Sequence, residues 1–430
     1  MRYLIIGNCI AGINAATSIR NLDTRNDVTI ISDEKYPAYG RCLISYYLAG
    51  THREKDILLK EKDFYQTSHI ELLLKNKVTS IEPESKRVVL KNGKKIKYDK
   101  LLLATGARAV PLGVEGENKK GVFRFRTLDD AKSILKLVPS SQRALVFGGG
   151  LIGLKTGYAL KKQGLDVEII VKSPFILSRV ADRNSAQLIT SWLIDNGIKI
   201  RTGLGPRTIL GNKWVEGVVL DSGEKEECQI IIAGKGVISN MEMADNVGIR
   251  THWGIVTDSF LKTSMDNIYA AGDVAETRDL VTGEYVTSAR WTSAAEQGRI
   301  AGLNMAGEPK EYPGSIPCNS AEFFGLPIIS MGHVQENDEG YETTVRSHPG
   351  EYRYKKIVVH KDRLVGAILI GRVENAGVYL ALIRKKADIS CVKHLLLEDW
   401  FDYGKVSHLI EGQDGFRESM SIGGDIIRIS

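Results

Sequence analysis

The chain has 430 residues, 43% of them hydrophobic and 26% charged, which is long enough for two to four domains with packed cores. Its 58 Lys and Arg residues are interspersed with 52 Asp and Glu residues, so the net charge of +6 indicates a solvated surface and argues against nucleic-acid binding. No stretch approaches the ~20 apolar residues of a membrane span, so no membrane partner is expected.

Five cysteines are spread along the chain without a Cys-x-x-Cys pair. Their odd number and their spacing argue against a disulfide framework or a metal site and indicate a reducing compartment. Met1 leads straight into an apolar run, without the charged segment, long apolar segment or cleavage site of a leader peptide. We therefore expect a cytoplasmic protein that binds no metal.

The first dozen residues predict a strand, a tight turn and a helix. The apolar run Tyr3–Ile6 predicts a buried strand, Gly7 breaks it, and the small residues of 11–16 predict the start of a helix. Such a turn directs backbone N–H groups and the positive end of the helix dipole at a ligand, which suits a pyrophosphate. The dinucleotide fingerprint is Gly-x-Gly-x-x-Gly, but here Cys9 lies between Gly7 and Gly12. Taken alone, this signal is weak.

A second predicted strand, residues 27–32, completes a β-α-β unit. Asp33 and Glu34 follow it, where the fingerprint places a carboxylate that binds a ribose, although a solvated pair of acids is the alternative. Arg41 could bind a phosphate through its planar guanidinium group. Further strands are predicted at 77–81, at 87–90 and, after a turn at Asn92-Gly93, at 96–98; residues 100–106 form a buried strand that ends in Thr105-Gly106.

A complete fingerprint follows a linker-like segment at residues 111–117. Residues 144–153 contain Gly148-x-Gly150-x-x-Gly153 between a predicted strand and a predicted helix that runs to about residue 163, and the next strand is 166–171. This signal is strong, and it shows an internal duplication: the chain carries two dinucleotide-binding units. Lys172 then stands where an acid usually favours NAD; it could tolerate a 2′-phosphate or simply be solvated, so NADH and NADPH both stay open.

The rest of the chain predicts two more strand ends with glycine and a final mixed segment. In residues 229–237 an apolar strand ends in Ala233-Gly234-Lys235-Gly236, and the strand 267–273 ends in Gly272-Asp273 before a helix around 294–298. After a boundary at 313–317, strands are predicted at 355–360 and 365–370 and a helix at 376–384.

Four of these features follow one another along the chain: the first glycine turn, the strand end at Thr105-Gly106, the second glycine turn and the strand end at Gly272-Asp273. This order resembles that of the two-dinucleotide-binding flavoproteins of the pyridine nucleotide–disulfide oxidoreductase superfamily. The resemblance covers nearly the whole chain. Residues 36–45, Tyr-Pro-Ala-Tyr-Gly-Arg-Cys-Leu-Ile-Ser, are most similar to the branch of rubredoxin reductases, nitrite-reductase flavoproteins and apoptosis-inducing factors. The resemblance implies an α/β fold with two Rossmann-like domains, which are a split FAD domain (1–112 and 243–311) and an inserted NAD(P) domain (113–242). A C-terminal α+β interface domain (312–430) would follow them.

The resemblance also implies site residues. Those expected around FAD are Gly7, Ile10, Ala11, Gly12, Asp33, Glu34, Arg41, Cys42, Val78, Ala104, Thr105, Gly106, Gly272, Asp273, Arg290 and Trp291. Those expected around NADH or NADPH are Gly148, Gly150, Leu151, Ile152, Gly153, Lys172, Gly234, Lys235 and Gly236. Lys155 occupies a helix position where relatives often carry Glu near the nicotinamide, so it is a candidate catalytic residue whose role is open.

Cys42 is the other candidate catalytic residue. Disulfide reductases carry two redox cysteines five positions apart, but Tyr47 stands five positions after Cys42, which excludes their mechanism. Single-cysteine relatives (NADH peroxidase, NADH oxidase and coenzyme A-disulfide reductase) place one redox cysteine where Cys42 falls, and that cysteine cycles through a sulfenate or a mixed disulfide. The alternative is that Cys42 is inert. Cys9 is expected to be a small residue that the first turn tolerates, and Cys228, Cys318 and Cys391 are expected to be packed. His394 and Glu398 are expected to form an i,i+4 surface pair on a helix.

The function implied is that of an FAD enzyme which oxidises NAD(P)H and passes electrons to rubredoxin or an iron–sulfur protein. One alternative is a Cys42-dependent NADH oxidase, peroxidase or coenzyme A-disulfide reductase. Another, of a different class, is a flavin-based redox-sensing or assembly protein. The resemblance leaves a homodimer open.

Overall fold

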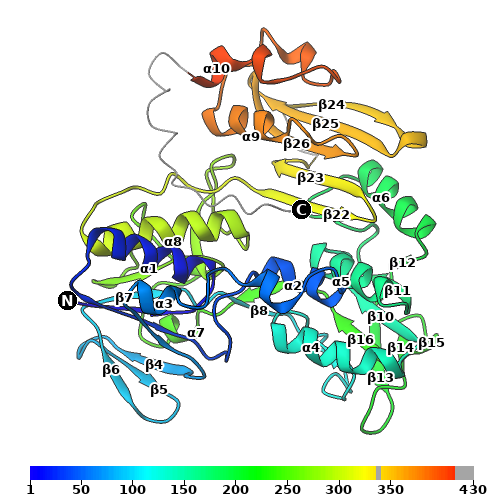
Figure 1. Cartoon of the computed structure of the whole chain (residues 1–430). Coiled ribbons are helices and arrows are strands. Elements are labelled where there is room, and N and C mark those ends of the chain that lie inside the picture. The colour runs from blue at the N-terminus through cyan, green and yellow to red at the C-terminus, as the bar shows by residue number, and fades with distance from the viewer. Residues whose placement is uncertain (336–339, 412–430) are drawn as a thin grey trace. The chain divides into compact units, whose positions relative to one another are not determined.

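A computed structural model describes residues 1–335 and 340–411, and the chain divides into two compact units (Figure 1). Unit 1 contains Met1–Arg179 and Ala186–Pro317. Unit 2 contains Val180–Ser185 and the chain from Cys318 onward. In the described part of the chain, no helix is both long enough and apolar enough to cross a membrane.

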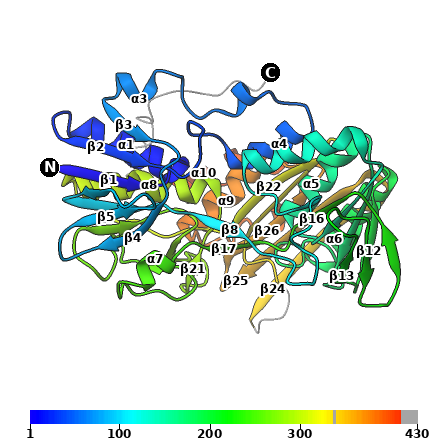
Figure 2. The ribbon, with the colours of Figure 1, turned by 90° about the horizontal axis from the view of Figure 1, so that it is seen from below.

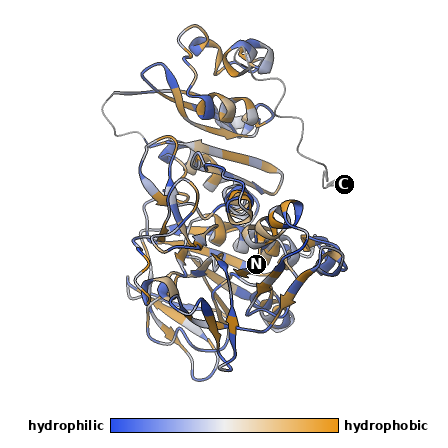
Figure 3. Ribbon diagram, turned by 90° about the vertical axis from the view of Figure 1, so that its left-hand side faces the viewer, coloured by the Kyte–Doolittle hydropathy of each residue, from blue (hydrophilic) through white to orange (hydrophobic). Residues whose placement is uncertain are grey.

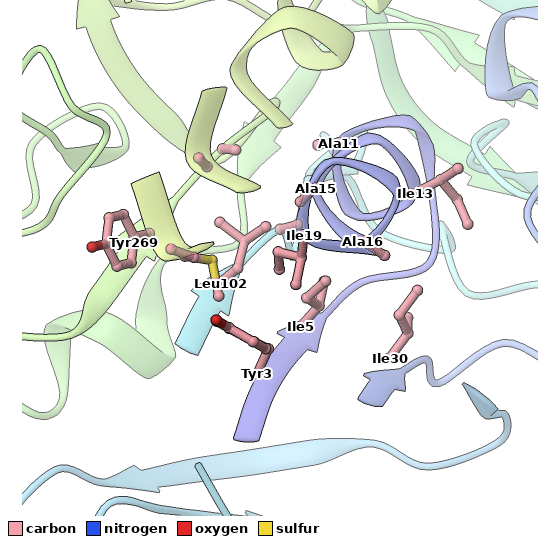
Figure 4. Close-up of a cluster of buried hydrophobic side chains, with 14 of the residues drawn as sticks. Tyr3, Ile5, Ala11, Ile13, Ala15, Ala16, Ile19, Ile30, Leu102 and Tyr269 are labelled. Atoms are coloured by element: carbon pink, nitrogen blue, oxygen red, sulfur yellow. The ribbon is translucent and has the colours of Figure 1, made fainter. Parts of the chain in front are cut away.

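The first parallel sheet of unit 1 has five strands in the order β19-β7-β1-β2-β3. Their bounds are Ile268–Ala270, Lys100–Leu103, Arg2–Ile6, Asp27–Ile31 and Ile70–Leu73. In the centre of the sheet, Ile5 is in register with Ile30 on one side and Leu102 on the other. These side chains point at the helix α1 (Ile10–Leu22) and bury its small residues (Figure 4).

Helix α8 (Trp291–Ala306) packs beside α1 at very short range (Figure 1). A Cβ atom at Gly298 would lie 2.1 Å from the carbonyl oxygen of Ala11, and one at Gly302 would lie 2.4 Å from that of Ala15. The two backbones therefore touch at these positions, which requires glycine on α8. The run of small residues that opens α1 follows from this contact.

The second parallel sheet of unit 1 also has five strands, in the order β12-β11-β10-β16-β9. Their bounds are Lys199–Thr202, Asp166–Val171, Arg143–Phe147, Ile230–Ala233 and Val122–Phe123. Helices α4 (Leu128–Leu137), α5 (Leu151–Lys162) and α6 (Arg183–Asp195) accompany it. The apolar strand predicted to end in Ala233-Gly-Lys-Gly236 is β16, which ends at Ala233, and the chain turns at Gly236, whose φ is +99°.

A short antiparallel pair joins the two sheets. Strand β17 (Val237–Ser239) pairs with β8 (Ala107–Ala109), so the chain segments after β16 and after β7 run side by side (Figure 2). Three small sheets, two of them antiparallel and one mixed, complete unit 1 together with three short helices. The sheets are β4 (Val78–Glu82), β5 (Arg87–Leu90) and β6 (Lys95–Lys97); β13 (Pro206–Leu210), β14 (Gly217–Leu220) and β15 (Lys225–Glu227); and β18 (Ile255–Val256), β20 (Ala275–Arg278) and β21 (Tyr285–Thr287). The helices are α2 (Ile44–Leu48), α3 (Phe64–Thr67) and α7 (Glu242–Asp245).

Unit 2 is built on an antiparallel sheet in the order β22-β23-β26-β25-β24. The strands are Cys318–Phe323, Leu326–Gly332, Arg363–Ile370, Arg353–His360 and Tyr341–His348, with the helices α9 (Ala376–Lys385) and α10 (Ser407–Glu411). Hydrophobic residues follow the strands, as Figure 3 shows for both units. The parallel sheets of unit 1, with their helices, and the strands and helices of unit 2 confirm the predicted α/β class with a mixed C-terminal segment.

Within unit 2, the segment 180–185 is fixed to the sheet by a buried ion pair. Lys356 of β25 has no exposed surface and lies 3.0 Å from the carboxylate of Asp182. Tyr354 donates a 2.7 Å hydrogen bond to the same carboxylate, and the backbone N–H of Ser185 donates another at 2.8 Å.

Two expectations for minor residues are wrong. His394 lies in a 3-10 turn (Lys393–Leu395), and Glu398 pairs instead with both terminal nitrogens of Arg346, at 2.7 and 3.0 Å. A local i,i+4 spacing could not reveal this partner because β24 brings it from 52 residues away. Cys391, expected to be packed, is exposed, whereas Cys228 is buried.

Candidate dinucleotide-binding site

The two predicted glycine turns have the same backbone geometry. Gly7 follows β1 with a φ of +120°, and Gly148 follows β10 with a φ of +134°. A Cβ atom at Gly7 would lie 2.1 Å from the carbonyl oxygen of Ala104, and one at Gly148 would lie 2.2 Å from that of Gly234. Both positions need glycine because of φ and because the neighbouring strand end passes over them.

The last glycines of the two fingerprints also correspond. A Cβ atom at Gly12 would lie 2.0 Å from the carbonyl oxygen of Gly7, and one at Gly153 would lie 1.9 Å from that of Gly148. The first turn of each helix is therefore pressed against the turn that precedes it. This is the close helix–strand packing for which the third glycine of the fingerprint is required.

The middle positions differ in residue but not in backbone. Cys9 (φ −129°, ψ −166°) and Gly150 (φ −80°, ψ 175°) are both extended N-caps, a conformation open to any residue. A Cβ atom at Gly150 meets nothing within 4 Å, so this side of the turn is open space. The Cys9 sulfur lies 3.8 Å from the carbonyl oxygen of Tyr39. Cys9 is thus compatible with a turn of this shape.

The first turns of α1 and α5 present backbone amides to that open space. The side chain of Cys9 makes no capping hydrogen bond, Gly150 has no side chain, and neither first turn, both of which lie in the described part of the chain, holds an acidic residue. Initial N–H groups of a helix lack acceptors within the helix, and the dipole favours an anion there. Ile10, Ala11, Leu151 and Ile152, all predicted site residues, lie in these turns. Both turns therefore fit a pyrophosphate.

The acids predicted for the ribose of the first site are separated in the structure. Asp33 is exposed, whereas Glu34 is half-buried and forms an ion pair with Arg41. Tyr39 donates a 2.6 Å hydrogen bond to Glu34, and its oxygen accepts one of 3.1 Å from the N–H of Leu128. Burial raises the pKa of Tyr39 well above its usual value, so the hydroxyl keeps its proton. Glu34 is thereby fixed beside β2, with Arg41 next to it.

Thr105 and Gly106 lie where β7 leaves its sheet. The Thr105 hydroxyl donates to the carbonyl oxygen of Asn240 at 2.9 Å, and the Asn240 amide donates to the carbonyl oxygen of Thr105, also at 2.9 Å. The backbone N–H of Asn240 donates a hydrogen bond to the carbonyl oxygen of Gly106. Asn240 was missed by sequence reasoning because it lies 135 residues away and carries no local pattern.

Asp273, expected near FAD, follows β19 and pairs with Arg126. Arg126 donates a 2.6 Å hydrogen bond to the Asp273 carboxylate and another of 3.2 Å to the carbonyl oxygen of Ala107. Gly272 has a φ of +83°, and its N–H donates a 2.8 Å hydrogen bond to the buried side chain of Gln297. Arg126 and Gln297 were both missed, since only the fold brings them to this strand end.

The remaining residues expected near FAD lie around the same sheet. Val78 is buried in β4, and Arg290 and Trp291 are the N-cap and the first residue of α8. Arg290 donates a 3.0 Å hydrogen bond to the Ser288 hydroxyl. These half-buried side chains stand at the start of α8.

Cys42 and Lys155, the two candidate catalytic residues, influence each other electrostatically. Cys42 is an exposed residue in the 3-10 turn Arg41–Leu43, and Lys155 lies in α5, with its ammonium group 5.4 Å from the ring centre of Tyr46 in α2. Desolvation by neighbouring protein atoms raises the pKa of the Cys42 thiol, while the charge of Lys155 opposes this. Burial lowers the pKa of Lys155. The structure therefore brings the two candidates together.

The other residues expected around NAD(P) lie at the carboxyl ends of β11 and β16. Lys235, after β16, is exposed and donates a 3.1 Å hydrogen bond to the carbonyl oxygen of Leu112. Gly236 has open space on its Cβ side. Lys172, directly after β11, is exposed and pairs with Asp221.

Two parallel sheets, each with a glycine turn of this geometry, define the class of two-dinucleotide-binding proteins. Residues 1–298 match the family model described as pyridine nucleotide-disulphide oxidoreductase, and residues 317–387 match the one described as rubredoxin NAD+ reductase C-terminal domain. The chain belongs to the pyridine nucleotide-disulphide oxidoreductase family. The predicted family and fold class are confirmed.

Similar proteins include several electron-transfer reductases. The chain is 31% identical to the rubredoxin-NAD(+) reductase of Pseudomonas putida, over 79% of this chain and 88% of that protein. It is 30% identical to the assimilatory nitrate reductase electron transfer subunit of Bacillus subtilis, over 92% of this chain and 51% of that protein, so it spans about half the length of this relative. The crystal structure of a covalent putidaredoxin reductase–putidaredoxin complex matches with a TM-score of 0.87 at 25% identity, over 96% of this chain and 99% of that one.

Proposed function

We propose that this chain binds FAD and oxidises NADH or NADPH, passing the electrons to a small carrier protein. The observation that carries the proposal is the pair of matching turns, Gly7–Gly12 and Gly148–Gly153, in one compact unit. One turn suits each dinucleotide, and the family match supports an oxidoreductase. The expected cytoplasmic location remains a prediction from the free cysteines.

The first glycine turn is assigned to FAD because Thr105 and Asp273 follow strands β7 and β19 of its sheet. The family resemblance implies that both residues lie near FAD. Residues 1–112 and 243–311 would form the FAD domain, residues 113–242 the NAD(P) domain, and residues 312–430 the C-terminal domain. When bound, FAD supplies the group that accepts a hydride and releases electrons singly. This chain's part is to bind and orient: amides of α1 and α5 hold pyrophosphates, and Glu34 and Asp273 offer hydrogen-bond acceptors.

A small redox carrier is the proposed acceptor. The C-terminal match to a rubredoxin reductase domain supports rubredoxin, and the similarity to a putidaredoxin reductase supports an iron–sulfur protein. A hydride transfer between stacked rings needs no protein acid or base, so the proposal requires no catalytic dyad. The carrier's docking surface is not assigned, and a homodimer remains a prediction.

The test is to purify the protein and measure its flavin content, its reduction by NADH and NADPH in a stopped-flow instrument, and NADH-dependent reduction of a rubredoxin and a [2Fe–2S] ferredoxin. Bound FAD with turnover of either carrier supports the proposal. Flavin reduction without reduction of either carrier contradicts the acceptor assignment. Failure to retain FAD contradicts the assignment of the first turn.

A Cys42-dependent reductase is the second candidate: Cys42 is an exposed free cysteine, and although desolvation raises the pKa of its thiol, the charge of Lys155 opposes that rise. Its acceptor would be a disulfide, coenzyme A disulfide, peroxide or oxygen. Substitution Cys42→Ser decides between the two. Acceptor reduction near the wild-type rate excludes the thiol mechanism, whereas loss of acceptor reduction with intact flavin reduction excludes the carrier mechanism.

A redox-sensing or assembly protein is the candidate of another class. The same stopped-flow experiment addresses it, because very slow flavin reduction with a long-wavelength charge-transfer band would favour a sensor. Fast turnover with any carrier would exclude it.

A further inference from the structure

The carboxyl end of β11 is the part of the second parallel sheet where a dinucleotide fold reads the adenosine ribose. In such folds an acid after this strand hydrogen-bonds to the 2′-hydroxyl, whereas a cation accommodates a 2′-phosphate. Here the residue directly after Val171 is Lys172, whose side chain is 75% exposed. By itself, Lys172 could tolerate a 2′-phosphate and leaves NADH and NADPH both open.

The structure places a carboxylate on this lysine from a different element. Asp221 begins the turn between β14 and β15, 49 residues after Lys172 in sequence, and its carboxylate forms an ion pair with the Lys172 ammonium group. The carboxylate also accepts a 3.2 Å hydrogen bond from the N–H of Gly205. It is therefore held by two donors.

The backbone fixes this carboxylate at the strand end. The N–H of Asp221 donates to the carbonyl oxygen of Gly205 at 3.0 Å, and the N–H of Leu204 donates to that of Val171 at 3.2 Å. A Cβ atom at Gly205 would lie 3.5 Å from the Lys172 side chain and 3.6 Å from the Asp221 carboxylate. The hairpin turn, the loop after β12 and the end of β11 thus form one contact, which we call the ribose edge (Val171, Lys172, Leu204, Gly205 and Asp221).

We infer that Asp221 is a specificity-determining residue that makes the site prefer NADH over NADPH. It supplies, from the β14–β15 hairpin, the carboxylate that the position after β11 lacks. This carboxylate would repel a 2′-phosphate, accept a hydrogen bond from a ribose hydroxyl and neutralise Lys172. The inference rests on the proposed function, because it assumes that the second turn binds NAD(P)H.

The charge state of the group agrees with this role. The Lys172 ammonium group and the N–H of Gly205 lower the pKa of Asp221, so the carboxylate is ionised at neutral pH. A 2′-phosphate carries nearly two negative charges at that pH, so like-charge repulsion at close range disfavours it.

The experiment compares the binding of NAD+ and NADP+, which differ only in the 2′-phosphate, to the flavin-loaded protein by isothermal titration calorimetry. Wild type is expected to bind NAD+ more tightly. Asp221→Asn should improve the affinity for NADP+ relative to NAD+ by roughly five- to tenfold, as expected for one charge interaction near a protein surface. Adding Lys172→Met to this variant should abolish the gain, because the uncovered cation is then absent.

Asp166→Asn is the matched control, since Asp166 begins the same strand and forms a 3.0 Å ion pair with Lys199 at the opposite end. It removes one carboxylate from a lysine without touching the ribose edge, so the affinity ratio should stay at the wild-type value. An unchanged ratio in Asp221→Asn, or an equal shift in the control, would overturn the inference. Absence of any NAD+ or NADP+ binding to wild type would instead overturn the proposed nucleotide site, and the inference with it.

Discussion

Arg126 and Asp273 form a 2.6 Å ion pair although 147 residues of sequence separate them. Arg126 precedes α4, beside the second parallel sheet, whereas Asp273 follows β19 in the first. The two side chains are only 20% and 17% exposed, so both charges are largely removed from water. The pair therefore connects the two predicted nucleotide-binding regions at the carboxylate proposed to contact FAD.

Substitution Arg126→Ala should lower the free energy of unfolding by about 1–3 kcal/mol, because it leaves a largely buried carboxylate without its cation. It should also speed the loss of flavin, since Asp273 is no longer held in place. Urea denaturation and the rate of flavin release by dialysis measure the two effects.

Arg124→Ala is the control for this substitution. Arg124 lies two residues earlier, is 46% exposed and pairs with Glu117 at 3.2 Å. The arginine of this pair is well exposed, and Glu117 keeps a 2.9 Å hydrogen bond from the N–H of Gly113 when Arg124 is removed, so the loss should cost only about 0–1 kcal/mol. Equal effects of the two substitutions would contradict the role given to the Arg126–Asp273 pair.

Gly153→Ala tests the close contact on which the second turn depends. The added methyl group would stand 1.9 Å from the carbonyl oxygen of Gly148, so the helix must shift, at a cost of about 1–3 kcal/mol, and NAD(P)H should bind more weakly. Gly377→Ala in α9 is the control: its Cβ side is open, so it should change stability by at most ~1 kcal/mol, in the favourable direction. Thermal unfolding and titration with NADH report both quantities. Wild-type NADH affinity in Gly153→Ala would contradict the assignment.

The sequence predicted the parts of the fold that depend on local pattern. Each glycine turn, and each strand end at Thr105 or Asp273, was predicted from residues within a dozen positions of one another, because a strand, a turn and a helix are local structures. The duplication was predicted because the same local pattern occurs twice. The partners of these residues, such as Arg126, Asn240 and Asp221, could not be predicted. Each comes from an element that only the tertiary fold brings near, and neither periodicity nor spacing records such pairs.

The reactivity of Cys42 should rise with pH beyond the range of an ordinary thiol. Its pKa is raised by desolvation, so the reactive thiolate is a minority at neutral pH and grows only as pH passes the raised pKa. Lys155→Met removes the charge that opposes this rise, so the pKa should increase further and alkylation at pH 8 should slow several-fold. Iodoacetamide labelling of the Cys42 peptide, followed by mass spectrometry from pH 6 to 10, measures the profile.

Lys162→Met is the matched control for the cysteine experiment. Lys162 lies at the other end of α5 with its ammonium group 5.9 Å from the ring centre of Tyr158, the same arrangement as Lys155 over Tyr46. It should leave the Cys42 profile unchanged. A plateau of wild-type labelling below pH 8 would show that the thiolate is already formed there, and would favour the Cys42-dependent reductase.

Breaking the buried pair Asp182–Lys356 should destabilise unit 2, because it leaves one buried charge without its partner. Lys356→Met keeps the volume but leaves Asp182 without its cation, which should cost about 3 kcal/mol. Combining it with Asp182→Asn should recover part of this loss, since the uncompensated charge is then gone. Urea denaturation at pH 7 of Lys356→Met and of the double variant checks the order, and a double variant that is less stable than Lys356→Met would contradict it.

The same pair has a predictable pH dependence. The hydrogen bonds from Ser185, Tyr354 and Lys356 outweigh burial and lower the pKa of Asp182 below that of the unfolded chain. The stabilisation is therefore complete above an unfolded pKa of about 3.9 and is lost as pH falls through the lower folded value. Asp182→Asn should flatten the loss of stability below about pH 4, as acid titration followed by circular dichroism would show.

Cys9→Gly restores the complete fingerprint and should bind FAD at least as tightly as wild type. The extended backbone of Cys9 does not require glycine, and the matching position Gly150 shows that a Cβ atom here points into open space, where a phosphate would lie. Removing the side chain therefore gives the phosphate more room and loses only a weak 3.8 Å contact of the sulfur with Tyr39. Glycine is also an acceptable N-cap, so stability should change by no more than ~0.5 kcal/mol. Flavin retained during gel filtration measures the outcome. Markedly weaker retention would show that the cysteine itself contributes to the site.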